Sequence, residues 1–358
     1  MIKPDLPEAH LNMGVVYQKS GHFERGLACY GSAQNCDPTY APARWLRLLS
    51  LPMLYDSPSQ IDHYRRQFTR QLDQLIKTTY LATDAQKQYA LKGIRSTTNF
   101  YLQYQGGNDL KLQTKYARFV HRVMAANHPQ WTQTRPMPPR NATDGIRIGY
   151  VSSFMCHHTV GTFLLGWVEN HDNSAFEIHC YHVGRKVDSL TKHFENMSHR
   201  FHFFCGDVET AARQIYEDRL HILVYSDIGM DPNTLQLAAL RLAPVQCKGW
   251  GHPVTTGLPT IDYYLSSDLM EPPQADRHYS ERLVRLPNLA LCYRKPQLPQ
   301  HPKTRRDFGI PSNRFVYLST QSIFKYLPQH DDLFVKIAQQ VPKALFVFIS
   351  NQSSFATE

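Results

Sequence analysis

The chain has 358 residues, of which 42% are hydrophobic and 19% are charged. This composition is typical of a soluble globular protein with two or three domains. The sequence has no apolar run of membrane length, and the order of residues at its start predicts no secretory signal. The net charge of +9 comes from cations scattered along the sequence, with no groove-reading motif and no basic stripe, so we expect no nucleic-acid binding.

Residues 1–40 are expected to form a single tetratricopeptide-like repeat. Five residues fall at the spacing of that repeat: Gly14, Tyr17, Tyr30, Ala33 and Pro38. In this interpretation the first glycine lets two helices approach, the tyrosines fill the groove between them, and the proline ends the second helix. Gly26 departs from the repeat, which usually has alanine there. Because stacked repeats normally need about three copies, we expect a single repeat to be the last of a longer array or to dock on the following helices. The alternative interpretation is an ordinary helical hairpin.

The helical pattern continues through a region that we place at residues 41–127. An amphipathic helix is expected over 61–80, and two helical pieces should flank the break at 106–108. Residues 128–145 are rich in proline and lack periodicity, so they are expected to form a linker that ends near Gly145.

After the linker, short apolar strands alternate with helical stretches, which predicts a parallel sheet covered on both faces. We expect strands at 146–153, 176–183, 221–228 and 261–267, and helices at 162–171, 189–197 and 210–219. A second strand–helix–strand set is expected at 314–320, 328–342 and 344–350. The fold class is therefore α/β with an all-α N-terminal part. Two strands and one helix cannot enclose a hydrophobic core, so we expect the sequence to be truncated at its C-terminal end.

Ligands of open α/β sheets bind at the carboxyl ends of the strands. The stretch "IRIGYVSSFMCHHTVGTF" passes from a strand into a helix through such a loop, and the loop carries His157 and His158. A histidine there has a near-neutral pKa, which suits proton transfer or a hydrogen bond to a sugar or phosphate. The plainer interpretation, which spacing alone favours, is an exposed loop residue or a hydrogen bond at the helix N-terminus.

The histidines and cysteines also bear on metal binding. His179 and His182 are the best-placed pair, but they lie three apart in an alternating strand, which sends them to opposite faces. The seven cysteines form no CxxC pair and are typical of reduced, buried thiols. We therefore expect no metal site and a cytoplasmic protein.

Four segments of the α/β part carry motifs in a fixed order. They are "IRIGYVSSFMCHHTVGTF", "HILVYSDIGMDPNTLQLAALRLAPVQ", "RLAPVQCKGWGHPVTTGLPTIDYYLSS" with its continuation to residue 288, and "FVYLSTQSIFKYLPQ". Together these segments resemble the O-GlcNAc transferase and SPINDLY family of glycosyltransferases, over roughly residues 146–342. The likeness is strongest to bacterial members with tetratricopeptide repeats that carry "GHPVTTG" and "FKYLP".

The resemblance implies a GT-B fold with two Rossmann-like halves. The first, catalytic half would span 146–300, and residues 301–358 would be an incomplete start of the donor-binding half. The implied activity is transfer of a sugar, expected to be N-acetylglucosamine, from a nucleotide diphosphate to Ser or Thr of a protein, with inversion and without a metal. The implied partners are the donor UDP-N-acetylglucosamine and an acceptor protein or peptide, with no further cofactor, no nucleic acid and no membrane.

The resemblance also implies roles for individual residues. His158 matches the family's active-site histidine, and Lys325 matches the lysine that stabilises the departing diphosphate. His221 matches a histidine at the acceptor side, and Ser322 stands where the animal enzymes carry a glutamine that contacts the nucleotide. The loop that lines the cleft is matched by His252, Pro253, Thr255, Thr256 and Gly257.

Each of these assignments has a structural alternative. Lys325 can be a solvated lysine, His252 a core histidine, and Thr255, Thr256 and Gly257 a simple turn, while His221 is more typical of a structural residue at a strand start. The family's downstream donor loop is not matched before Glu358, so the chain alone is expected to be inactive. The alternative functions are a non-enzymatic, protein-binding relic with tetratricopeptide helices, or an enzyme for a small sugar, against which the repeat argues.

Overall fold

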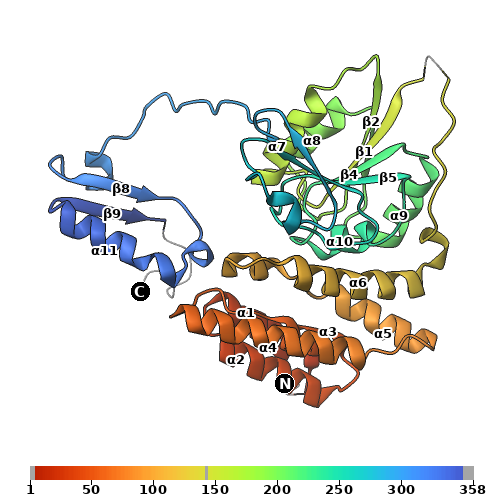
Figure 1. Ribbon diagram of the computed structural model, residues 1–358, viewed down its shortest axis with the longest axis horizontal. Coiled ribbons are helices and arrows are strands. Elements are labelled where there is room, and N and C mark those ends of the chain that lie inside the picture. Colours follow the sequence, from red (N-terminus) through yellow and green to blue (C-terminus); the bar gives the residue numbers. More distant parts are fainter. Residues whose placement is uncertain (1–4, 142–143, 350–358) are drawn as a thin grey trace. The chain divides into compact units, whose positions relative to one another are not determined.

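The computed structural model describes residues 5–141 and 144–349 (Figure 1). These residues divide into two compact units. The first unit takes in residues 5–71, 101–107 and 295–349, and the second takes in residues 72–100, 108–141 and 144–294. The division into five segments expected from the sequence stays a prediction.

The first two helices form a tightly packed hairpin. Helix α1 spans Pro7–Lys19 and α2 spans Phe23–Cys36. A Cβ atom at Gly14 would lie 2.5 Å from the Tyr30 ring and 3.0 Å from the carbonyl oxygen of Gly26, so only glycine fits at this crossing. The expected close approach of the two helices at Gly14 is therefore confirmed, while the assignment as a tetratricopeptide repeat stays a prediction.

Four further helical elements follow the hairpin. They are α3 (Ala41–Leu49), α4 (Pro58–Lys77), α5 (Asp84–Ile94) and α6 (Leu110–Asn127). The 3-10 helix η1 (Phe100–Gln105) precedes α6, and Gly106, at φ +71°, marks the expected break between them. In the part of the chain that the structure describes, no helix has the length and apolar character needed to cross a membrane.

The proline-rich segment is anchored to the second unit. It contains the short 3-10 helix η2 (Pro129–Trp131), and Trp131 is buried. Arg135 donates to the backbone carbonyls of Tyr216 (2.9 Å) and Leu242 (2.7 Å) and lies 3.7 Å from the Tyr216 ring centroid. The segment therefore lacks regular structure, as expected, but it is held in place rather than free; residues 142–143 of the expected linker lie outside the described residues.

The second unit contains a seven-stranded, fully parallel sheet in the order β3-β2-β1-β4-β5-β6-β7. The strands are β1 (Ile146–Ser152), β2 (Phe176–His182), β3 (Arg200–Phe203), β4 (Ile222–Tyr225), β5 (Val245–Lys248), β6 (Tyr263–Ser267) and β7 (Arg282–Leu286). The helices are α7 (Thr159–Glu169), α8 (Ser189–Met197), α9 (Val208–Glu217) and α10 (Pro232–Ala238). The strand order reverses between β1 and β4, which is where open α/β sheets form their binding crevice.

The expected second α/β set is present in the first unit. Strands β8 (Phe315–Ser319) and β9 (Ala344–Phe348) pair in parallel, and α11 (Asp331–Gln340) connects them. This small sheet leaves large apolar side chains exposed: Phe315, Leu318, Leu333 and Phe348. The fold class predicted from the sequence, an all-α N-terminal part followed by a Rossmann-like half and the start of a second one, is confirmed.

Candidate functional site

Asp227 and Asp231 accept hydrogen bonds from the loop that follows β1, at the point where the strand order reverses. Asp227, just after β4, is fully buried; its Oδ2 accepts the backbone N–H of Ser153 (3.1 Å), and its Oδ1 accepts the hydroxyl of Ser226 (2.9 Å). Asp231 accepts the hydroxyl of Ser153 (2.7 Å) and caps the N-terminus of α10. These bonds fix the start of the β1–α7 loop, five residues before His158.

His158 is the N-cap of α7. Its Nδ1 accepts the backbone N–H of Val160 (3.1 Å), and its ring stacks on Phe154 with centroids 4.2 Å apart. Burial, and then the Lys186 ammonium, lower the pKa of His158, so the imidazole is neutral near pH 7. A neutral imidazole whose Nδ1 accepts carries its proton on Nε2. His158 in this geometry therefore offers an Nε2–H donor rather than a base. The hydrogen bond at the helix N-terminus, which was the plainer interpretation of this residue, is present.

The neighbouring histidine is tied to α8 instead. The backbone N–H of His157 donates to Asp188 (2.8 Å), and its Nε2 lies 2.9 Å from the Ser189 hydroxyl. His157 also lines a cavity of about 330 Å³ between α7 and α8, in which Glu169 pairs with His193 (2.6 Å) and Arg294 (2.7 Å). The two adjacent histidines therefore anchor the loop to two different helices.

The loop after β5 carries "GHPVTTG", residues 251–257. His252 in this loop is only 1% exposed and stacks on Phe100 with centroids 5.6 Å apart, while Pro253 is exposed. Burial, and then Lys248, lower the pKa of His252 well below its usual value, so the ring is neutral. Its Nε2 has no hydrogen-bond partner among residues 5–141 and 144–349. His252 is a core residue with one unsatisfied nitrogen.

Glu281 holds the threonines of the loop. The Thr255 hydroxyl (2.6 Å), the Thr256 backbone N–H (2.7 Å) and the Thr256 hydroxyl all donate to this buried carboxylate. Gly257 has φ +71°, and a Cβ there would lie 2.5 Å from the backbone of Gln113. The geometry is that of the turn alternative, and the role of these residues in lining the cleft stays a prediction.

Lys248 supports the same loop from inside the protein. It is fully buried at the carboxyl end of β5, and its Nζ donates to the Val254 carbonyl (2.6 Å). Burial lowers the pKa of Lys248 to about 7, against the opposing influence of the Glu281 charge. Sequence reasoning missed Asp227, Lys248 and Glu281. Nothing in the local sequence marks the first two as buried, because Lys248 ends the polar strand β5 and Asp227 resembles a solvated residue shortly after β4.

His221 lies at the other end of the sheet. It directly precedes β4, and its Nδ1 accepts the backbone N–H of Arg147 (3.0 Å) at the start of β1. Burial, and then Arg147, lower the pKa of His221. The structure thus does not bring His221 together with His158 at the carboxyl ends, and its geometry is that of the structural alternative.

Ser322 and Lys325 belong to the first unit. The 3-10 helix η5 (Ile323–Lys325) follows the carboxyl end of β8, and both Ser322 and Lys325 are exposed. The Phe324 ring packs edge-on against Tyr101 and Tyr104, which fixes the loop. Lys325 has no ion-pair partner in the described part of the chain, so its ammonium is available to an anionic ligand.

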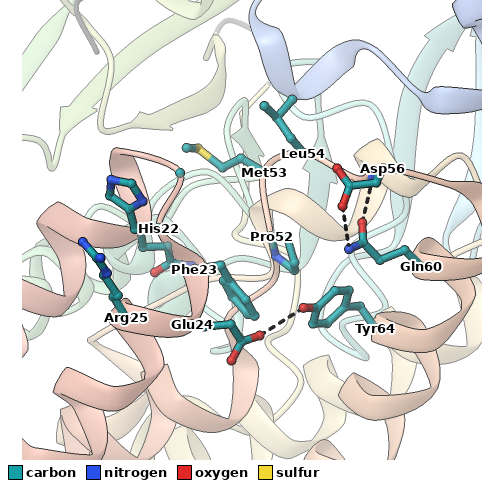
Figure 2. Close-up of a pocket in the computed structure, with 12 residues that line it drawn as sticks. His22, Phe23, Glu24, Arg25, Pro52, Met53, Leu54, Asp56, Gln60 and Tyr64 are labelled. Carbon is teal, nitrogen blue, oxygen red and sulfur yellow. Dashed lines mark hydrogen bonds between the residues drawn. The ribbon is translucent and has the colours of Figure 1, made fainter. Parts of the chain in front are cut away.

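A pocket of about 460 Å³ lies among the N-terminal helices. Figure 2 shows the side chains that line it. Glu24 and Asp56 lie on its walls with Arg25 and His22, and Tyr64 donates to Glu24 (3.1 Å). Because acidic and basic groups share this wall, the pocket is not matched to a ligand of one charge.

His179 and His182 do not form a metal site together. His179 Nε2 lies 2.9 Å from Glu177, and His182 Nε2 lies 2.8 Å from the Lys186 carbonyl. Within residues 5–141 and 144–349, no group of three or more His, Cys, Asp or Glu side chains is placed to hold a metal ion.

Comparison with known proteins decides the family. The profile described as Glycosyl transferase family 41 matches residues 111–301, which is more than half of the chain. The chain belongs to glycosyl transferase family 41. The expected resemblance is confirmed, and the match spans the seven-stranded sheet with the loops after β1 and β5.

Curated relatives of this family 41 chain include plant proteins. The probable UDP-N-acetylglucosamine–peptide N-acetylglucosaminyltransferase SPINDLY of Solanum lycopersicum is 30% identical over 251 residues, covering 67% of this chain and 26% of the relative. The Arabidopsis thaliana protein of the same name is 30% identical over 228 residues, covering 62% and 24%. The family 41 chain therefore spans about a quarter of the length of these relatives.

A solved structure supports the fold. A mutant O-GlcNAc transferase of Thermobaculum terrenum superposes with a TM-score of 0.61 at 22% identity, covering 97% of this family 41 chain and 62% of that chain.

The buried Asp227 predicts a pH-dependent stability. Burial, and then Asp231, raise the pKa of Asp227 from 3.8 to about 7. Between these values the unfolded chain has lost the proton that the folded chain keeps, so the stabilisation contributed by this group is full below pH 4 and is lost as pH rises through 7. The free energy of unfolding should fall by about 4 kcal/mol from this group, since one pKa unit is worth about 1.4 kcal/mol.

Urea titrations of wild type and Asp227→Asn at pH 4, 5.5 and 7 measure this effect. Asparagine mimics the protonated carboxyl, so the two proteins should be similar near pH 4 and the variant should become relatively more stable toward pH 7. A difference in unfolding free energy that stays constant with pH would show that Asp227 does not titrate in this range.

Proposed function

We propose that this family 41 chain acts in protein O-glycosylation. It would transfer N-acetylglucosamine from the donor UDP-N-acetylglucosamine to a Ser or Thr hydroxyl of a protein. One observation carries the proposal: the family profile covers the parallel sheet whose polar loops meet at the β1–β4 strand-order reversal. The printed names of the plant relatives, which state a UDP-N-acetylglucosamine donor and a peptide acceptor, support this choice of substrates.

In the proposed reaction the acceptor oxygen forms a bond to the sugar C1 as the bond from C1 to the diphosphate oxygen breaks. Attack from the opposite face inverts the anomeric carbon, the hydroxyl proton goes to a base, and UDP leaves. Charge builds on the departing diphosphate, and we assign its stabilisation to Lys325, without a metal, as the resemblance implies. The proposed protein is cytoplasmic and acts on proteins.

The other predicted residues are assigned to substrate positioning or to support of the fold. We propose that His158 positions a substrate oxygen through its Nε2–H, and that the exposed Pro253 and Ser322 contact substrate directly. We assign His252, Thr255, Thr256 and Gly257 to shaping the loop from behind, because they are buried. His221 supports the amino end of the sheet, and no substrate contact is assigned to it.

A second candidate function is a protein-binding module without transfer activity. Its support is that the Thr255 and Thr256 hydroxyls are both committed to Glu281 rather than free for a ligand. Incubating the protein, produced from its native gene, with labelled UDP-N-acetylglucosamine, UDP-glucose or GDP-fucose and an acceptor lysate tests the two candidates. Labelled protein only with UDP-N-acetylglucosamine supports the proposal; label from another donor overturns the sugar, and no label at all supports the binding module.

The role of His158 can be separated from its structural role. Asparagine is a good N-cap, so His158→Asn should keep α7 capped and the unfolding temperature nearly unchanged, while it removes the Nε2–H donor. We expect transfer to fall by up to about tenfold, the typical worth of one neutral hydrogen bond. A loss of about 10²–10⁴, together with loss of the acidic limb of the pH–rate profile, would identify His158 as a general base instead.

A further inference from the structure

Helix α6 carries a stripe of four cations that the linear sequence conceals. Lys111, Lys115, Arg118 and Arg122 are spaced by four, three and four residues, so they lie along one face of the helix over about 16 Å. The expectation of no basic stripe was therefore wrong, because residues that are scattered in sequence align at helical spacing. These cations line a groove of about 410 Å³.

The groove has an apolar floor and little negative charge. Its other lining residues include Ile76, from the end of α4, and Phe119, which is 2% exposed. Lys115 pairs with Asp73 (2.6 Å), and Arg122 donates to the Ile76 carbonyl (3.2 Å). Lys111 and Arg118 are exposed and have neither an ion pair nor a hydrogen bond within the described ranges 5–141 and 144–349.

This arrangement costs free energy in the absence of a partner. Like charges at i,i+4 destabilise a helix by about 0.2–0.5 kcal/mol per pair, and the stripe contains two such pairs. The single carboxylate of Asp73 offsets one of the four charges. An anionic ligand along the groove would offset the repulsion between these cations and would form ion pairs with Lys111 and Arg118.

We propose that this groove binds an acidic, partly apolar peptide segment of a partner protein. Carboxylates would pair with Lys111 and Arg118, while an aliphatic side chain would cover Ile76 and the edge of Phe119. Single-stranded nucleic acid fits less well, because the only ring in the groove is buried and offers no face on which a base could stack. The proposal does not depend on sugar transfer.

The test measures the binding of a short fluorescein-labelled peptide of glutamates and leucines at helical spacing, by fluorescence anisotropy. Lys111→Glu/Arg118→Glu should weaken binding about tenfold or more, because two attractive contacts become repulsive. The matched control is Lys92→Glu/Lys192→Glu, which makes the same charge change at exposed helical lysines of the same unit and should change binding by less than about twofold. Thermal melts check that all variants are folded.

Two further probes complete the test. A peptide with serines in place of the leucines should bind several-fold more weakly, and an oligouridine should bind more weakly than the leucine peptide. Equal losses in the two double variants, equal binding of the serine peptide, or absence of peptide binding would overturn the proposal. Tighter binding of the oligouridine would overturn it in favour of a nucleic-acid partner.

Discussion

Replacing Lys325 by alanine is expected to lower the turnover of sugar transfer by about 10²–10³-fold, the usual effect of removing one preorganised donor at a site of developing charge. The residue is exposed in the loop after β8, so its loss should leave the unfolding temperature nearly unchanged. Its ammonium is not committed to a carboxylate in the described chain, which leaves it free to meet a diphosphate. The measurement is initial rate on an acceptor peptide at matched folded fraction.

Lys336→Ala is the control, because Lys336 is an exposed lysine of α11 in the same small α/β set. It should leave turnover unchanged. Retention of more than half the activity by Lys325→Ala would show that the motif "SIFKYLP" has been mapped wrongly onto the family.

Replacing Glu281 by alanine should destabilise the protein by about 3–5 kcal/mol, because three buried donors lose their acceptor and each costs about 1–3 kcal/mol when left unpaired. The change leaves the Thr256 backbone N–H and the hydroxyls of Thr255 and Thr256 without their acceptor. It also removes the negative charge that offsets the buried Lys248 ammonium. Chemical denaturation at pH 7 measures the loss.

Two further variants serve as comparisons for Glu281→Ala. Glu281→Gln keeps one acceptor oxygen and should lose less stability than alanine, while Glu209→Ala, at an exposed position of α9, should change stability by less than about 0.5 kcal/mol. A loss below about 1 kcal/mol for Glu281→Ala would mean that water replaces the carboxylate at little cost.

Elements with a strong apolar pattern were predictable from the sequence. The helix expected at 189–197 is α8, and the strands expected at 176–183 and 344–350 are β2 and β9, each to within two residues. Strands β3, β5 and β7 were missed, because they carry polar residues that mask the apolar pattern. They form because the backbone of a neighbouring strand hydrogen-bonds to them in the sheet.

The candidate site was predictable only where a single segment defines it. The sequence placed His158 after β1 and Lys325 after β8, because a loop between a strand and a helix can be recognised locally. Asp227 and Glu281 were missed, because their importance comes from partners 74 and 25 residues away in the sequence. Without those partners an acidic residue beside a strand is indistinguishable from a solvated one.

The proposed function is tested most directly by transfer of labelled N-acetylglucosamine from UDP-N-acetylglucosamine to a protein acceptor, by the protein produced from its native gene. Site mapping by mass spectrometry identifies the modified residues. We expect labelled Ser and Thr side chains with wild type and about 10²–10³-fold less label with Lys325→Ala. Equal labelling by the two proteins, or no labelling by a folded wild type across a broad acceptor lysate, would contradict it.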